Sequence, residues 1–145
     1  MDNDAFDGAK AAVFIGERLL VYQRDRRADL RWSEMWDFPG GGREGPESPT
    51  QTLARELDEE FGLDLAAGKE LWRHEQAADF DPALRVWFFV LQFPQAARNS
   101  LRFGAEGQRW DLWPVRRVLA SAEVIPSLRQ RLALWQTRFE SQRLD

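Results

Sequence analysis

The pattern of hydrophobic and polar positions starts with two short apolar runs, at residues 10–15 and 18–23. Gly16 and Glu17 separate them, and glycine tolerates the positive φ that a tight turn requires. The pattern therefore predicts a β-hairpin. The polar, arginine-rich stretch 24–34 comes next and is predicted to be a surface loop, a kind of segment that often carries binding residues.

Further along, apolar runs bounded by proline, glycine and polar clusters predict more strands and loops. Three glycines after Pro39 predict a sharp turn that can bring backbone groups close to a ligand. The predicted strands cover residues 36–38, 69–76, 84–93 and 108–113, the turns cover 40–42 and 77–82, and a polar loop covers 94–104.

A final helix is predicted from Pro126 to about residue 142, after one or two helical turns at 116–120. Its apolar residues fall on one side, and three arginines are predicted to lie away from them. Such a helix packs on the sheet or forms a dimer interface, and the pattern leaves both open. The apolar residues are Leu128, Leu132, Trp135 and Phe139, and the arginines are Arg129, Arg131 and Arg138.

The best-marked helix lies between Ser48 and Gly62. Ser48 suits the N-cap, and Gln51 stands where a capping-box partner belongs. Pro49 suits the first helical position, and Gly62 suits the C-terminal stop. Apolar residues recur every four positions and predict a buried stripe of Leu53, Leu57 and Phe61.

Three glutamates, Glu56, Glu59 and Glu60, share one arc of this helix because their spacing is i, i+3, i+4. Clustered like charges weaken a helix, and the helix has no lysine to offset them. Arg55 can pair with Glu59 but does not neutralise the cluster. A divalent cation held by carboxylate oxygens and a solvated acidic face both fit this pattern.

Composition narrows the choice of metal. The chain has no cysteine and a single histidine, His74, which excludes cysteine-zinc, iron–sulfur and multi-histidine sites. A metal must therefore bind oxygen, which suits Mg²⁺ or Mn²⁺. The formal net charge of −4 argues against a nucleic-acid polymer as partner.

Residues 1–145 are expected to form a single domain, because this length supports one hydrophobic core but not two ordinary ones. Residues 1–10 are acidic and lack the apolar segment of a secretory signal. The longest apolar run, 86–91, is far shorter than the roughly 20 residues of a membrane helix. We therefore expect a cytoplasmic protein with no membrane partner.

Residues 41–63 resemble the Nudix box, with no departure at a defining position. Residues 36–41 also resemble the lead-in of the MutT-like branch, and residues 106–108 resemble a downstream stretch of it. The defining positions of the box are Gly41, Glu47, Arg55, Glu56, Leu57, Glu59, Glu60, Gly62 and Leu63.

This resemblance implies an α/β fold, an α/β/α sandwich around a mixed β-sheet, with the box as a loop–helix–loop. It also implies Mg²⁺- or Mn²⁺-dependent hydrolysis of a nucleoside diphosphate linked to another moiety. The implied metal ligands are Gly40, through its carbonyl, with Glu56, Glu59, Glu60 and Glu106. Arg55 would orient the glutamates, and Gly41, Glu47 and Gly62 would support the box. Whether Glu56, Glu59 or Glu106 is the general base stays open.

Aromatic rings stack on nucleobases and guanidinium groups bind phosphates, which gives a set of substrate-binding candidates. Residues 121–126 lack the asparagine that reads the purine in the best-known MutT-like enzymes, so the base remains open. Gly42 and Pro46 also replace the lysine and glycine common in those relatives. The substrate-binding candidates are Arg24, Arg26, Arg31, Trp32, Phe80 and Trp113.

The leading hypothesis is hydrolysis of a pyrophosphate bond in a nucleoside di- or triphosphate, or a derivative. One alternative is a pyrophosphatase for ADP-ribose, nucleotide sugars or dinucleotides. Another, of a different class, is a non-catalytic nucleotide-binding or sensing module with the same fold. In each case the expected partner is a small nucleotide-type molecule, bound by a monomer or a homodimer.

Overall fold

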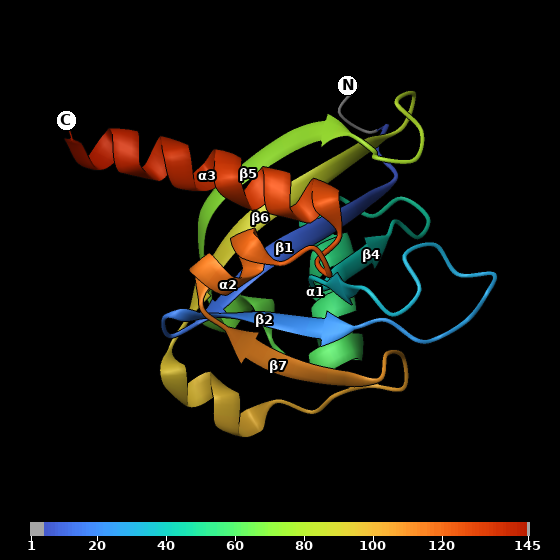
Figure 1. Ribbon diagram of the computed structural model, residues 1–145, viewed down its shortest axis with the longest axis horizontal. Coiled ribbons are helices and arrows are strands. Elements are labelled where there is room, and N and C mark those ends of the chain that lie inside the picture. Colours follow the sequence, from blue (N-terminus) through green and yellow to red (C-terminus); the bar gives the residue numbers. More distant parts are fainter. Residues whose placement is uncertain (1–4, 145) are drawn as a thin grey trace.

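The computed structural model describes residues 5–144, and their side chains as far as Phe139. A mixed, seven-stranded sheet forms its centre, with helices on both faces (Figure 1). The strands are β1 Gly8–Ile15, β2 Arg18–Gln23, β3 Trp36–Asp37, β4 Gly40–Gly42, β5 Lys69–Ala77, β6 Arg85–Phe93 and β7 Arg109–Trp113. The helices are α1 Pro49–Phe61, α2 Val115–Ala120 and α3 Pro126–Leu144, with short 3₁₀ helices η2 Leu65–Ala67 and η3 Gln95–Ser100.

The main path of the sheet runs β3-β2-β1-β6-β5, with β4 paired to β1 and β7 paired to β2. Strands β1 and β6 are parallel, in register from Gly8 opposite Val86 to Ile15 opposite Phe93. The other strand pairs are antiparallel, including the predicted hairpin of β1 and β2. The predicted α/β/α sandwich around a mixed sheet is thus confirmed.

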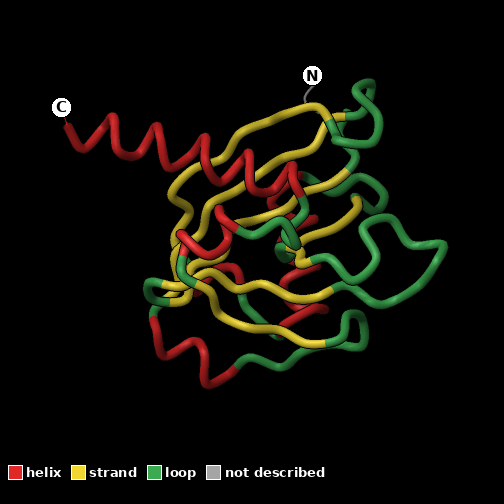
Figure 2. The backbone as a smooth tube through the Cα atoms, viewed as in Figure 1, coloured by secondary structure: helices red, strands yellow, loops and turns green. Residues whose placement is uncertain are grey.

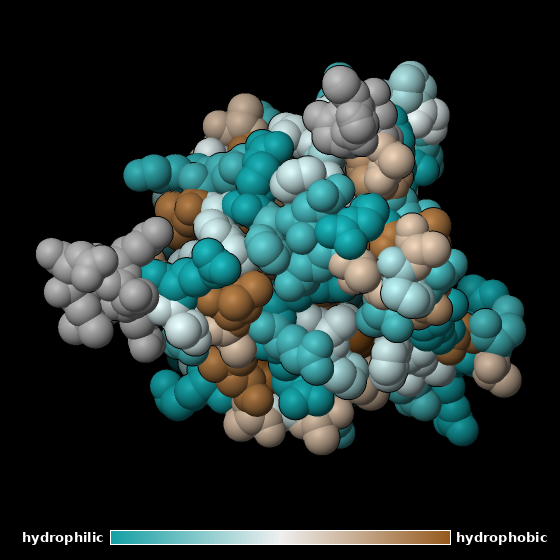
Figure 3. Space-filling view, turned by 90° about the horizontal axis from the view of Figure 1, so that it is seen from above, coloured by the Kyte–Doolittle hydropathy of each residue, from teal (hydrophilic) through white to brown (hydrophobic). Residues whose placement is uncertain are grey.

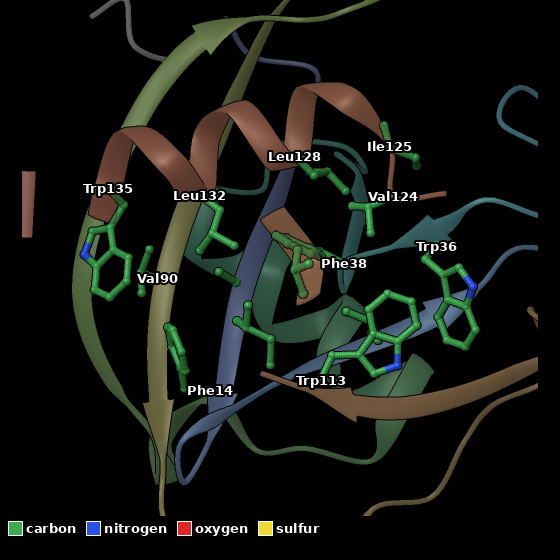
Figure 4. Close-up of a cluster of buried hydrophobic side chains, with 14 of the residues drawn as sticks. Phe14, Trp36, Phe38, Val90, Trp113, Val124, Ile125, Leu128, Leu132 and Trp135 are labelled. Carbon is green, nitrogen blue, oxygen red and sulfur yellow. The ribbon is translucent and has the colours of Figure 1, made fainter. Parts of the chain in front are cut away.

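Each face of the sheet has its own hydrophobic core. On one face α1 buries Leu53, Leu57 and Phe61 completely, as its stripe predicts. On the other face α3 buries Leu128 and Leu132. Figure 4 shows these two side chains and Trp135 pointing from α3 toward the sheet. Alternate residues of β6 supply the two cores, because neighbouring side chains of a strand point to opposite faces.

Four expectations need correction. The glycines 40–42 form strand β4 rather than only a turn, because side chains there would block its close pairing with β1. Part of the predicted polar loop 94–104 is the 3₁₀ helix η3. On α3, Arg131 is buried on the apolar side instead of lying away from it, whereas Phe139 is 41% exposed.

The loops that follow β2, β4 and β5 gather on one side of the sheet, at the right of the view in Figure 2. In the view of Figure 3, hydrophobic residues form separate patches among hydrophilic ones. Among the described residues, no helix has the length and apolar character to cross a membrane. The loops after β2 and β5 carry the predicted site residues Arg26, Trp32 and Phe80.

Candidate active site

Helix α1 is fixed at both ends by the predicted caps. The backbone N–H of Gln51 donates to Ser48 Oγ at 3.1 Å, and the N–H of Ser48 donates to Gln51 Oε1 at 2.9 Å. Gly62 closes the helix with φ 64°, a left-handed conformation that glycine adopts without strain. With its apolar stripe against the sheet, the helix presents Glu56 and Glu60 toward β4.

Arg55 ties the loop before the helix to the helix itself. Its Nε donates to Glu47 Oε2 at 2.7 Å, and its Nη2 donates to the Gly42 carbonyl at 2.8 Å. Its Nη1 donates to Glu56 Oε2 at 3.1 Å and to Glu59 Oε1 at 3.3 Å. One side chain therefore sets the positions of three glutamates, which is the arrangement expected for this arginine.

Glu47 is held by several donors at once. Besides Arg55, its carboxylate accepts hydrogen bonds from the backbone N–H of Glu44 and the hydroxyl of Thr52, both at 2.9 Å. These bonds, that of Arg55 first, lower the pKa of Glu47 to about 2. Glu47 therefore stays ionised and secures the loop in a fixed shape.

A cavity of about 380 Å³ lies between β4 and α1. Glu56, Glu60 and Glu106 line it together with the backbone of Gly40 and Gly41. A Cβ atom added at Gly41 would lie 2.5 Å from Glu56 Oε2, so only glycine lets this carboxylate approach the strand so closely. The glycine run thus brings backbone and carboxylate oxygens to one surface.

The two helix carboxylates of this cavity are held in a poorly solvated place. Glu60 accepts from the Gly40 N–H at 2.9 Å and from the Tyr22 hydroxyl at 3.4 Å. Burial nevertheless raises the pKa of Glu60 to about 8, more than the nearby Lys10 lowers it. Burial also raises the pKa of Glu56, against the opposing effect of Arg55. A cation in the cavity would relieve both penalties.

The donor set suits a hard divalent cation, because it consists of carboxylate and carbonyl oxygens. Among the described residues, however, no three histidine, cysteine, aspartate or glutamate side chains converge into a ready-made site. Glu59 does not line the cavity; its side chain is 57% exposed and bonded to Arg55. The Gly40 carbonyl accepts from Lys10 Nζ at 3.3 Å. Glu56 and Glu60 therefore fit a metal best, with Glu106 on the same cavity.

Asp37 forms a buried charge network beside this cavity. Its carboxylate, with no exposed surface, accepts from Arg24 Nη1 at 2.9 Å and from Lys10 Nζ at 3.1 Å. The Tyr22 hydroxyl donates to the same oxygen at 3.2 Å. Two cations thus compensate one buried carboxylate and are fixed at the cavity wall, where phosphate oxygens would meet positive charge.

A second cavity, of about 160 Å³, lies next to the first. Lys10, Arg24, Phe80 and Val86 line both, so the two cavities are adjacent. The second cavity lies between the loops after β2 and β5 and the start of α3. Its further lining includes Arg31, Trp32, Asp37, Asp79, Ser127 and Arg131.

Four of the six predicted substrate-binding residues line the second cavity, and the other two do not. Arg24, Arg31, Trp32 and Phe80 line the second cavity, and the Arg31 guanidinium lies over the Phe80 ring at 4.1 Å from its centroid. Trp32 has φ 60°, a strained conformation for a bulky residue, which is common at functional sites.

Two other candidates do not fit. Trp113 is 2% exposed and packs against Trp36 in the core, so it cannot stack on a substrate base. Arg26 is 84% exposed, pairs with Glu34 and lines neither cavity. Several site residues were missed because each lies inside an apolar run or away from the motif. They are Lys10, Tyr22, Asp37, Asp79 and Arg131.

Comparison with known proteins identifies the family. The sequence model of the NUDIX domain family matches residues 7–134, which is most of the chain. The protein belongs to the NUDIX domain family.

Its relatives are named as diphosphatases or pyrophosphohydrolases of nucleotides. An 8-oxo-dGTP diphosphatase of Haemophilus influenzae is 28% identical over 117 residues, 81% of this chain and 82% of that protein. An 8-oxo-dGTP diphosphatase of Proteus vulgaris is 57% identical over 55 residues, or 38% of this chain. A CTP pyrophosphohydrolase of Escherichia coli is 36% identical over 59 residues, or 41% of this chain. The matched stretches span only 49% and 42% of these last two proteins.

Solved structures of other proteins share the fold. The MutT protein of Methanosarcina mazei superposes with a TM-score of 0.71 at 17% identity, covering 90% of this chain and 92% of its own. The ORF135 protein of E. coli gives a TM-score of 0.69 at 20% identity, covering 100% and 99% of the two chains. These similarities extend the match from the motif to the whole sheet and its flanking helices.

Proposed function

We propose that this NUDIX protein hydrolyses a pyrophosphate bond in a nucleoside di- or triphosphate, or in a related nucleoside diphosphate derivative. The observation that carries the proposal is that the two cavities are adjacent and share four lining residues. Glu56 and Glu60 face the glycine strand in one, and arginines with aromatic rings line the other. A molecule with a phosphate chain at one end and an aromatic base at the other matches this division. The names of the relatives are consistent with it.

Mg²⁺ or Mn²⁺ would be held by Glu56 and Glu60, with Glu106 as a further ligand and Glu59 joining after release from Arg55. Such an ion offsets charge on a diphosphate and lowers the pKa of bound water. The chain itself orients Glu56 and Glu59 through Arg55 and binds phosphate oxygens through Arg24. It also provides carboxylates that can accept a proton from water, and Glu56, Glu59 and Glu106 remain alternatives for that role.

The test is an activity panel with Mg²⁺ and with Mn²⁺, using EDTA as the metal-free control. Substrates are the four canonical nucleoside triphosphates, their deoxy forms, 8-oxo-dGTP, ADP-ribose, a dinucleoside polyphosphate and a nucleotide sugar. Products are identified by mass, and a reaction in ¹⁸O-water shows which phosphorus is attacked. We expect metal-dependent cleavage that leaves a nucleoside monophosphate or diphosphate.

Glu56→Gln removes one charge from the cavity with little change of shape, and we expect turnover to fall by about 10²- to 10⁴-fold. Asp58→Asn is the matched control, since Asp58 lies on the same helix, is exposed and lines neither cavity. Equal loss in both variants would contradict the assignment. Cleavage of only ADP-ribose, the dinucleotide or the sugar would favour the first alternative. Tight nucleotide binding without cleavage would favour a sensing module.

A further inference from the structure

Arg131 is the unexplained charged residue of the second cavity. It projects from α3, is only 7% exposed and lines the cavity wall. Among the described residues its guanidinium makes a single, long hydrogen bond, from Nη2 to the Ala77 carbonyl at 3.5 Å. Arginine carries five N–H donors, so most of them have no partner among the residues that the structure describes. A buried charge with few partners is costly, and a ligand that accepts its hydrogen bonds would offset that cost.

Asp79 lies on the same cavity and supplies the opposite chemistry. Its Oδ2 accepts a hydrogen bond from Ser127 Oγ at 3.0 Å, which leaves its other carboxylate oxygen available to the cavity. The charges of Asp79 and Arg131 interact, and desolvation lowers the pKa of Arg131 more than Asp79 raises it. The two groups make no ion pair within 4.0 Å among the described residues. The cavity therefore presents a row of donors near a separate acceptor.

The nucleobases differ in the hydrogen-bond donors and acceptors that they can present to a guanidinium and a carboxylate. A planar guanidinium donates two parallel hydrogen bonds to adjacent acceptors, and guanine offers O6 and N7 for this purpose. Cytosine offers O2 and N3, and both bases also carry an amino group that donates to a carboxylate. Uracil and thymine have an N–H between their carbonyls and no amino group, so their O4 would face the Asp79 carboxylate. Adenine places its amino group beside each ring acceptor on that edge and has no adjacent pair.

We propose that Arg131 and Asp79 read the substrate base and select cytosine or guanine nucleotides over those of uracil, thymine and adenine. The inference rests on the proposed function, because it takes the second cavity as the place of the base. Phe80 and Trp32 form the apolar walls, and the two charged residues meet the polar edge of the ring. Neither residue belongs to the 41–63 motif or lines the cavity of Glu56 and Glu60.

The test compares Arg131→Met, Arg131→Lys and Asp79→Asn with the unaltered protein. Methionine keeps length without donors, and lysine keeps the charge but not the planar fork. We expect the unaltered protein to favour CTP over UTP in kcat/KM by roughly 5- to 150-fold, the range that one bidentate contact supplies. Arg131→Met should abolish this ratio, chiefly through a lower kcat/KM for CTP. Arg131→Lys should lie between them.

Asp79→Asn should shift the preference between CTP and UTP toward UTP. An asparagine amide can donate to O4 of uracil, so this variant should raise kcat/KM for UTP and lower it for CTP. Its side chain is exposed, so the variant is expected to fold. A thermal melt checks each variant, and a CTP-to-UTP ratio that is near one in the unaltered protein, or unchanged in Arg131→Met, would overturn the proposal.

Binding separates this inference from the proposed function. Calorimetry with analogues of CTP and UTP in which CH₂ replaces both bridging oxygens of the triphosphate measures base selection without turnover. Selection that disappears in Arg131→Met, in a protein that cleaves no nucleotide, would support the base-reading role and reject the proposed hydrolysis. Hydrolysis without base selection in either measurement would reject the base-reading role alone.

Discussion

Glu47 and Glu60 are two glutamates of one motif in opposite environments. Glu47 accepts hydrogen bonds from Arg55, Thr52 and a backbone N–H, and its pKa falls to about 2. Glu60 faces the cavity with fewer donors, and burial raises its pKa to about 8. The first is fully compensated by the protein. For the second, the nearby Lys10 offsets only part of the cost of burial, which a bound cation would offset further.

This difference separates a glutamate that stabilises the loop from a glutamate that is available to a ligand. A carboxylate that is satisfied internally stabilises the loop and has little capacity left for a ligand. A carboxylate that is desolvated and undercompensated carries a cost that a bound cation would remove. Substitutions at the two sites should therefore change stability in opposite directions and turnover to different extents.

The largest effect is expected for Glu60→Gln. Loss of a metal-binding carboxylate should reduce Mg²⁺-dependent turnover by more than about 100-fold, because ion and water are no longer held in place. The same change removes a poorly solvated charge, so the metal-free protein should be more stable than the unaltered one at pH 9. Steady-state kinetics and urea unfolding in EDTA measure the two quantities. Lower turnover together with lower stability at pH 9 would indicate that Glu60 is structural.

Glu47→Gln should behave in the opposite way. The amide cannot accept every bond that the carboxylate accepts, so Arg55 loses its strongest partner and the loop loosens. We expect a lower free energy of unfolding at neutral pH and a fall in turnover of about 10- to 100-fold, as for residues that orient metal ligands. Excess Mg²⁺ should restore part of the turnover, since the ligands themselves remain. Unchanged stability would refute the supporting role.

Gly41→Ala tests the close approach between the glycine strand and the helix. The new Cβ would meet the Glu56 carboxylate at 2.5 Å, and the carboxylate can yield by rotating away. We expect a fall in turnover of about 10-fold with a small change in stability, because displaced catalytic groups lower the rate more than the fold. Gly42→Ala is the matched control: its added Cβ would have only the Asp7 carbonyl within 4 Å, at 3.9 Å. Similar kinetics in the two variants would contradict the prediction.

The parts predicted well from sequence depend on neighbours along the chain. Caps, apolar spacing and the glycine stop fixed the bounds of α1, and the hairpin of β1 and β2 followed from its turn. Site residues supplied by distant elements were harder to find. Asp37 acquires its role only when Lys10 and Arg24 arrive from other strands.

Arg131 shows a signal that was present but overlooked. With Leu128, Leu132 and Trp135 it forms an i, i+3, i+4, i+7 series, so helical geometry places it on the buried side. Charge alone suggested solvent instead. Trp113 shows the reverse error, since its aromatic ring suggested base stacking, yet it pairs with Trp36 within the core. In both cases the residue type suggested the wrong location, because position in the fold decides whether the side chain is buried or exposed.

The smallest effect expected is the pH dependence of stability in the metal-free protein, where the two glutamates act in different ranges. The folded-state pKa of Glu60, about 8, lies above its ordinary value of 4.5, so the folded state binds the proton more tightly. Stability from this group is therefore full below pH 4.5 and declines as the pH rises toward 8. For Glu47, with a folded-state pKa of about 2, stability is present above pH 4.5 and is lost as the pH falls toward 2.

Urea unfolding in EDTA between pH 3 and 9 measures both slopes, and difference curves against Glu60→Gln and Glu47→Gln isolate each group from the other titrating residues. The Glu60 difference should grow between about pH 5 and 8. The Glu47 difference should shrink below about pH 4.5. Saturating Mg²⁺ should flatten the Glu60 slope and leave the Glu47 slope in place, because only the cavity carboxylate gains a new partner. Equal flattening of both would erase the distinction between the anchored glutamate and the one that faces the cavity.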